Sequence, residues 1–199
     1  AGDWIWIGSD GPGMNYYSYQ DDAIRTVPGT AVLREVHSIY EQNDSTLWIA
    51  TNGYGVYEGK FTSYGGRPSM QSLSRVEFPA PLADVTKFFS IHPQMDTVIW
   101  FGSRGAGAAS LNTSSGLIQV HEFPTDRGYA SNEIFYVSKS AKMNFASGSG
   151  LVTYDERTGR SEISPDIPHR LIHGILNGAD GDLWLSTNYG LVSYDESTG

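Results

Sequence analysis

The fold is decided by the C-terminal stretch DLWLSTNYGLVSYDESTG, residues 182–199. This stretch holds two short apolar runs, from Leu183 to Leu185 and from Leu191 to Tyr194, separated by small polar residues and a glycine. Short apolar runs that are bounded by turn-forming residues are typical of paired β-strands. The stretch therefore predicts a hairpin of two strands.

Parts of this hairpin recur along the chain. The second strand and its turn, GLVSYDESTG at 190–199, match GLVTYDERTG at 150–159 without a gap and differ only at Thr153/Ser193 and Arg157/Ser197. The first strand recurs as WIGS, WIAT, WFGS, NFAS and WLST, which begin at positions 6, 48, 100, 144 and 184 and so lie 42, 52, 44 and 40 residues apart. A period of about 40–45 residues with four strands per unit is the signature of β-propeller blades.

The remaining apolar runs complete an all-β architecture of about five blades, each of four antiparallel strands, the first and last incomplete. The blades occupy approximately residues 1–30, 31–83, 84–128, 129–167 and 168–199, as a single partial β-propeller domain. The predicted strands are 4–9, 14–19 and 23–27; 33–41, 46–51, 55–61 and 73–78; 86–92, 97–103, 107–112 and 117–123; 133–138, 143–147, 151–154 and 160–163; and 170–176, 183–187 and 191–194.

Two further expectations come from this assignment. Residues 62–72, which include Gly65 and Gly66, are predicted to form a long loop that helps account for the 52-residue interval. The first blade would lack its innermost strand and the last blade its outermost, so the two cannot complete each other. The chain is therefore predicted to be a fragment of a larger propeller, one of seven blades.

The composition limits the partners. Asp and Glu number 22 against 13 Lys and Arg, so the formal net charge is −9. An acidic surface disfavours nucleic acid and anionic membranes. The sequence has no cysteine and hence no disulfide and no thiolate metal site. We expect no nucleic-acid partner, no membrane contact within these residues and no cofactor.

Residues that recur at one position of the blade are interpreted as structural. The repeated tryptophans Trp6, Trp48, Trp100 and Trp184 could be platforms on which sugars stack, but their recurrence favours packing between blades. The small residues that end the same strands are Ser9, Thr51, Ser103, Ser147 and Thr187. A catalytic nucleophile would be expected once, so these hydroxyl groups are also interpreted as structural.

At these residues the chain resembles the two-component regulator propeller repeat. That repeat has an acidic or Asn turn, a strand of the form Leu/Ile-Trp-hydrophobic-Gly/Ala/Ser-Thr/Ser, then Gly-Leu and Tyr-Asp. The match is close from Asp182 to Asp195, and from Thr46 to Tyr57 it holds with a shifted second strand. Asn144 replaces the tryptophan in the fourth blade, and the segment GYASNEI at 128–134 resembles the link into the next blade.

The resemblance implies the ligand-sensing module of an extracytoplasmic sensor domain, in a hybrid two-component system histidine kinase/response regulator that detects glycan fragments. In that family two seven-bladed propellers and an Ig-like domain precede a membrane span and a cytoplasmic kinase. It thus implies a periplasmic location, a parent protein anchored in the inner membrane and an oligosaccharide ligand. It implies no catalysis by these residues.

Candidate ligand-binding residues are those that differ between repeats at loop positions, because packing does not dictate them. In propellers the loops after the second strands and the links between blades share one face, where ligands usually lie. Arginine can bind a carboxylate or sulfate through two bonds, and tyrosine can stack on a sugar. The candidates are Asn52, Tyr54, Arg104, Arg127, Tyr129, Asn132, His169, Arg170, Asn188 and Tyr189.

Two patterns that suggest a metal have simpler interpretations. His169 and His173 have the spacing of a zinc pair on a helix, but on a strand four residues span about 13 Å, too far to share a metal. Asp180-Gly181-Asp182 resembles part of a calcium loop, and a hairpin turn explains it. We predict no metal site.

Two other functions remain open. Related propellers include streptogramin and polysaccharide lyases, which need a base and a charge-neutralising group near one carbon. His92, His121 and Tyr129 are the candidates for that chemistry, and no spacing joins them. A scaffold that only binds protein is the other alternative.

Self-association through the terminal blades is also expected. Their apolar strands, Trp4–Ile7 and Met14–Tyr19 at one end and Leu183–Leu185 and Leu191–Tyr194 at the other, would each expose a face of several hundred Å². Covering such a face is favourable by several kcal/mol at about 25 cal/mol per Å².

Overall fold

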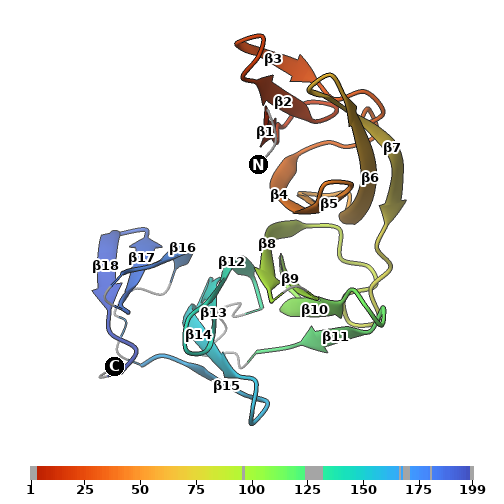
Figure 1. Cartoon of the computed structure of the whole chain (residues 1–199). Coiled ribbons are helices and arrows are strands. Elements are labelled where there is room, and N and C mark those ends of the chain that lie inside the picture. The colour runs from red at the N-terminus through yellow and green to blue at the C-terminus, as the bar shows by residue number, and fades with distance from the viewer. Residues whose placement is uncertain are drawn as a thin grey trace. The chain divides into compact units, whose positions relative to one another are not determined.

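A computed structural model describes residues 4–95, 97–123, 132–165, 167, 171–179 and 181–197 of the chain. Within these ranges the regular elements are all β-strands, 18 in number, and they form five antiparallel sheets (Figure 1). Strands adjacent in sequence are adjacent in each sheet, which is the topology of a propeller blade. The all-β prediction of propeller blades is confirmed.

The five sheets are named blades 1 to 5 in chain order. Blade 1 contains β1 (Trp4–Ile7), β2 (Asn15–Ser18) and β3 (Ala23–Thr26). Blade 2 contains β4 (Val36–Asn43), β5 (Thr46–Thr51), β6 (Val56–Tyr64) and β7 (Arg67–Arg75). Blade 3 contains β8 (Phe88–Gln94), β9 (Val98–Ser103), β10 (Ala108–Asn112) and β11 (Ile118–His121). Blade 4 contains β12 (Ile134–Lys139), β13 (Met143–Ser147), β14 (Gly150–Asp155) and β15 (Arg160–Ile163). Blade 5 contains β16 (Ile172–Asn177), β17 (Leu183–Thr187) and β18 (Gly190–Tyr194).

Each predicted strand overlaps an observed one, and β5, β13, β15 and β17 match at both ends. The predicted loop at 62–72 is wrong. Tyr64 of β6 pairs with Arg67 of β7, so these strands continue to a two-residue turn. Gly65 and Gly66 form that turn with φ of 56° and 70°. Two consecutive positive φ angles make a turn whose twist matches an antiparallel hairpin, and glycine adopts them without strain.

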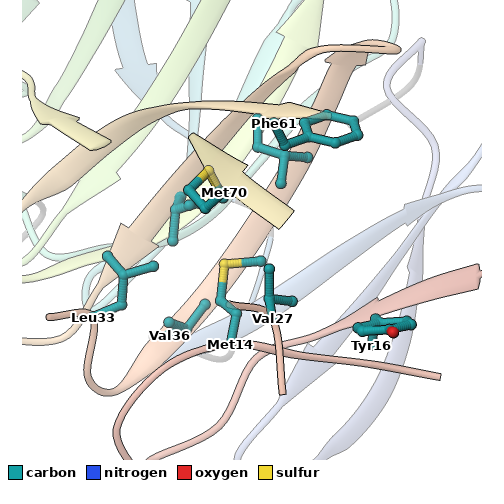
Figure 2. Packing of buried hydrophobic residues seen from close by; sticks show 9 residues of the cluster. Met14, Tyr16, Val27, Leu33, Val36, Phe61 and Met70 are labelled. Atoms are coloured by element: carbon teal, nitrogen blue, oxygen red, sulfur yellow. The ribbon is translucent and has the colours of Figure 1, made fainter. Parts of the chain in front are cut away.

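The chain contains two compact units, described separately below. The first comprises Ala1–Phe78 with Thr86–Ile91, and the second comprises Pro79–Val85 with His92–Gly199. The core of the first unit lies between blades 1 and 2, and Figure 2 shows its buried side chains. Met14, which directly precedes β2, and Val27, which directly follows β3, pack in one cluster with Phe61 and Met70 of blade 2. The indole of Trp6 packs edge-on against Phe61, with ring centroids 5.2 Å apart.

Two cores in the second unit lie between consecutive blades. In one, Trp100 and Phe123 of blade 3 and its C-terminal flank pack against Val137 and Phe145 of blade 4. In the other, Leu151 and neighbouring residues of blade 4 pack against Ile172, Ile175, Leu183 and Leu185 of blade 5. All residues of β13 are buried, because this strand has a neighbouring blade on each side. A strand covered on both faces lacks the alternation of apolar and polar residues.

The small residues that end the second strands close the turns that follow. The hydroxyl groups of Thr51, Ser103, Ser147 and Thr187 donate to the carbonyls of Gly55, Gly107, Gly150 and Gly190 at 2.7–2.9 Å. Ser9 makes the longer equivalent bond to Gly13, at 3.5 Å. The structural interpretation of these five residues is confirmed. The turns of blades 2 and 3 have one residue more than those of blades 4 and 5, which explains the shifted match after Thr51.

A pair of glycines in one turn gives a test of this packing. Gly107 (φ 81°) has room for no side chain, because an added Cβ would lie 2.1 Å from the carbonyl oxygen of His121. Gly105 (φ 99°) has no atom within 4 Å of that position. We predict that Gly107→Ala lowers the free energy of unfolding by about 3 kcal/mol or more, and Gly105→Ala by only about 1 kcal/mol of backbone strain. Urea unfolding measures both, and equal losses would contradict the packing described.

Candidate functional site

The predicted ligand-binding loops of blades 3 and 4 meet at Arg104 and Glu133. Arg104 follows β9, and its Nε lies 2.8 Å from a carboxylate oxygen of Glu133, the residue before β12. The backbones of the two residues also form an isolated antiparallel bridge. The Arg104 side chain remains half exposed. An arginine oriented by a carboxylate and open to solvent can bind an anionic or hydroxyl-bearing ligand.

Asn132 joins the same two blades. Its backbone carbonyl accepts the N–H groups of Gly105 at 3.0 Å and Gly107 at 2.8 Å. Its side-chain carbonyl accepts the N–H of Phe123 at 2.8 Å. These three bonds fix the turn that carries Arg104. The geometry therefore gives Asn132 a positioning role, and contact with a ligand stays a prediction.

The first unit has an equivalent arrangement after β5. There the carbonyl of Thr86 accepts the N–H groups of Gly53 at 3.0 Å and Gly55 at 2.7 Å. The side-chain amide of Asn52 donates to Glu35 at 2.7 Å, and its Oδ1 is buried without a hydrogen-bond partner. Tyr54 lies at the tip of this turn, with its ring partly exposed. Asn52 and Tyr54 thus share one rigid turn.

The other candidates lie elsewhere. Asn188 and Tyr189 occupy the exposed turn between β17 and β18, where the Tyr189 N–H donates to Thr187 Oγ1 at 3.1 Å. In the described part of the second unit, no contact joins Asn188 to Arg104. Arg127, Tyr129, His169 and Arg170 lie outside the described residues. The structure thus brings Arg104 and Asn132 together, and it places Asn188 with Tyr189.

Sequence reasoning missed the carboxylates that hold these loops. Glu35 and Glu133 each stand directly before the first strand of a blade. Their backbone carbonyls accept the N–H groups of Asn52 at 2.9 Å and Gly148 at 3.2 Å, so the two positions are equivalent. The signal in the sequence was a glutamate directly before the first strand of a blade. Because only blades 2 and 4 have this glutamate, comparison of the repeats did not identify it.

The repeated tryptophans differ in burial. The indole N–H groups of Trp48 and Trp100 donate to Gln42 at 2.9 Å and to Gln94 at 2.6 Å, and both rings are buried. Trp100 packs edge-on against Phe145 of blade 4 at 5.4 Å. Trp184 of blade 5 is 39% exposed. Trp6 and Trp100 each have the following blade in the same unit, and each packs against a phenylalanine of that blade.

The histidines considered for lyase chemistry lie apart. His92 is in β8 and His121 is in β11, and two strands of blade 3 separate them. Four adjacent strands span about 14 Å, too far for two groups to act on one carbon. Tyr129 lies outside the described residues. His121 instead lies 2.9 Å from Ser110 through Nε2, and its ring packs against Trp100 and Tyr154.

Neither a metal cluster nor a membrane-spanning helix occurs among the described residues. No group of three His, Cys, Asp or Glu side chains there could hold a metal ion. His173 lies in β16 and packs against Phe135 at 5.4 Å, while His169 and Asp180 are outside the described residues. No helix in those residues is long and apolar enough to cross a bilayer.

These sheets define the chain as a set of propeller blades, and comparison with known proteins agrees. No family model matches the chain. It is 25% identical over 217 residues to "Histidine kinase P4" of Formosa agariphila, covering 98% of this chain and 15% of that protein.

Two groups of solved structures share the fold. The extracellular domain of the hybrid two-component system BT4673 from B. thetaiotaomicron is similar with a TM-score of 0.77 and 20% identity, over 99% of this chain and 25% of that one. Virginiamycin B lyase from Staphylococcus aureus is similar with a TM-score of 0.66 and 16% identity, over 96% of this chain and 66% of that one. This chain spans about a quarter of the first and two thirds of the second.

Burial of His121 predicts a pH dependence of stability. Burial lowers the pKa of His121 from its usual 6.5 to about 4, and burial lowers the pKa of His92 as well. Between pH 6.5 and 4 the unfolded chain therefore binds a proton that the folded chain does not, and stability falls as the pH falls. Because the ring is partly exposed, we expect His121 to account for about 1–2 kcal/mol of this loss.

The variant His121→Phe isolates this contribution, because it keeps an aromatic ring without a titrating group. Urea unfolding of both proteins at about pH 7 and about pH 4.5 should show a smaller loss of stability in the variant. Titration of the Glu156 carboxylate does not contribute to the loss of stability over most of the interval from pH 7 to pH 4.5. Burial alone would raise its pKa, but hydrogen bonds from Lys139 and Gln94 outweigh it and lower the pKa, so its contribution is lost only below about pH 4.5. Equal losses in both proteins would contradict the assignment.

Proposed function

We propose that the chain is a ligand-binding module of an extracytoplasmic two-component signalling receptor, and that it recognises a glycan fragment without catalysis. The observation that carries the proposal is the turn after β9 in the second unit. There the carboxylate of Glu133 orients Arg104, and backbone hydrogen bonds hold the turn rigid. Rigid polar side chains on a scaffold are the usual design of a binding site.

The comparisons support the sensor class. Of the two solved structures compared, the one with the higher TM-score is the extracellular domain of a hybrid two-component system, and the sequence relative is named as a histidine kinase. By analogy we place this chain in the periplasm, in a parent protein anchored in the inner membrane. The kinase, the membrane anchor and the rest of such a receptor are part of the proposal.

The chemistry of the turns favours an acidic or sulfated sugar as the ligand. Guanidinium groups bind carboxylates and sulfates through paired hydrogen bonds. Arg104 has five N–H groups, and the contact with Glu133 involves its Nε. A ligand anion can therefore bind the half-exposed guanidinium while Glu133 keeps it oriented.

A binding experiment tests this proposal. We predict that a panel of uronate-containing and sulfated oligosaccharides includes one that binds the 199-residue chain in calorimetry, and that Arg104→Ala weakens this binding by about tenfold, the value of one charged hydrogen bond. Arg25→Ala is the matched control, because Arg25 is also half exposed and paired with a carboxylate, that of Asp21 at 2.8 Å, on blade 1. Equal losses in both variants, or binding by no member of the panel, would contradict the proposal.

The alternative function is that of a lyase. The similarity to virginiamycin B lyase is the observation that favours it. The separation of His92 from His121 in blade 3 argues against a base and a neutralising group formed by these two. Incubation with uronic-acid polymers and with a streptogramin B distinguishes the functions. Formation of an unsaturated uronate product or of a linearised antibiotic would establish the lyase.

Self-association through the terminal blades is a further part of the proposal. Blade 1 exposes Ile5 (50%) and Ile24 (66%), and blade 5 exposes Leu176 (69%), Trp184 (39%) and Leu191 (66%). Several large apolar side chains exposed on one sheet are typical of a surface that another protein surface covers. This pattern would also serve a scaffold that binds another protein.

We predict that the 199-residue chain forms dimers or larger species at concentrations of about 0.1 mM, because covering these side chains removes apolar area from water. The double variant Trp184→Ser/Leu191→Ser should shift the equilibrium towards the monomer in light scattering after size-exclusion chromatography. Tyr64→Ser, an exposed residue of β6 in blade 2, is the control and should leave it unchanged. A wild-type chain that remains monomeric would show the proposal to be wrong.

A further inference from the structure

A cavity lies between blades 3 and 4 at the end of the strands that is remote from Arg104. Its volume is about 360 Å³, and its lining residues belong to the second unit. Val98, at the start of β9, lines the cavity, whereas Arg104 follows the other end of that strand. Six residues of strand span about 20 Å, so this cavity is separate from the predicted ligand face. We call it the junction cavity.

Aromatic rings form much of its wall. Trp100 of β9, His121 of β11 and Tyr154 of β14 all line it. The ring centroids of Trp100 and His121 are 4.5 Å apart, and those of His121 and Tyr154 are 5.1 Å apart. Three rings from two blades thus enclose one space. Aromatic walls of this kind bind the apolar face of a ring-shaped ligand.

Polar groups are built into the cavity at fixed positions. Gln94 and Ser110 line it and are only 7% and 8% exposed. Gln94 Oε1 accepts the indole N–H of Trp100 at 2.6 Å, and its amide nitrogen donates to Glu156. Ser110 Oγ lies 2.9 Å from His121 Nε2. These bonds hold Gln94 and the His121 ring in place in the wall of the cavity, which Tyr154 also lines.

The charge of the cavity favours an uncharged ligand. Among the described residues that line it, Glu156 alone is ionised at neutral pH, and Lys139 neutralises it at a distance of 2.5 Å. An anionic ligand would meet the carboxylate without a free cation nearby. A cationic ligand would compete with Lys139 for that carboxylate. A neutral ligand with hydrogen-bond donors and acceptors is neither repelled by the Glu156 carboxylate nor in competition with Lys139 for it.

The next junction along the chain, between blades 4 and 5, lacks this aromatic wall. Between blades 4 and 5, Tyr194 and Glu196 occupy the positions of Tyr154 and Glu156 in the repeated sequence. Asn144 replaces Trp100 there, and its amide donates to Glu196 at 2.9 Å. The Tyr194 hydroxyl accepts a bond from Ser164 at 3.1 Å. The cavities at this junction have volumes of about 220 and 620 Å³, and neither has a tryptophan in its wall.

We infer that the junction cavity between blades 3 and 4 is a second binding site, and that it takes a neutral, hydroxyl-bearing ring of the size of one or two sugar units. The ring packs on His121 and Tyr154, and its hydroxyl groups bind Tyr154 Oη and the amide and carboxylate groups at the rim. A cavity of this volume lies at the small end of the range for ligand sites, which suits a monosaccharide or disaccharide. The site is independent of the proposed anionic-sugar site at Arg104.

Nuclear magnetic resonance of the indole N–H groups tests this inference directly. The chain has 5 tryptophans, and the Trp100 signal is assigned with the variant Trp100→Phe. Methyl glucoside, maltose and lactose are titrated as neutral probes, and glucuronate as the charged one. We expect at least one neutral sugar to shift the Trp100 signal with a Kd of about 1–10 mM, as expected for roughly a dozen ligand atoms at ordinary efficiency. Glucuronate should cause no saturable shift.

Two matched variants decide where the sugar binds. Tyr154→Phe removes one hydroxyl from the cavity and keeps its ring, so the affinity should fall about fivefold. Tyr194→Phe makes the same change at the next junction and should leave the affinity unchanged, as should Arg104→Ala at the other end of the strand. The inference is overturned if no neutral sugar shifts the Trp100 signal at about 50 mM, or if both tyrosine variants lose affinity equally. The Arg104 variant separates this result from the outcome of the anionic-sugar experiment.

Discussion

The packing of one blade against the next is the interaction on which the rest of this structure depends. A sheet of three or four strands with apolar residues on both faces cannot be stable in water alone, and stacked repeats solve this by covering one another. In the second unit β13 is buried throughout because blade 3 contributes Trp100 on one side and blade 5 contributes Ile172 and Leu185 on the other. The strand order, the repeated tryptophans and the tight turns follow from that requirement.

The repeated Tyr-Asp-Glu sequence shows how one motif serves this packing. Tyr154 packs against Trp100 and His121 of the preceding blade, and Glu156 binds Gln94 there. Asp155 accepts the N–H of Arg157 at 2.8 Å and so forms the turn that follows. Burial and the nearby Glu156 raise the pKa of Tyr154 above its usual 10. Packing between blades thereby fixes the positions of the Tyr154 and Glu156 side chains at the end of β14.

The sequence predicted the strands well where they are buried on both faces. It did not predict the exposed hairpin turn at Gly65 and Gly66 or the contacts between residues that are far apart in sequence. Residues 46–51 and 143–147 were correct at both ends because their apolar runs stop at the small residue that closes the turn. The Gly65-Gly66 hairpin was missed because its strand tips are polar and exposed. Contacts such as Arg104 with Glu133, or Gln94 with Glu156, join residues 29 and 62 positions apart, and no periodicity reveals them. The junction cavity depends on such contacts, so only the structure shows it.

The central claim, that side-chain contacts between consecutive blades hold the fold and form its binding surfaces, is tested most directly by a double-mutant cycle. Gln94→Ala, Glu156→Ala and the double variant are compared with the wild-type chain by urea unfolding. Residues that share one hydrogen-bond network between blades should show a coupling free energy of about 0.5–3 kcal/mol. Losses that add to within about 0.3–0.5 kcal/mol would contradict the account, because they would mean that the two blades do not stabilise each other through this contact.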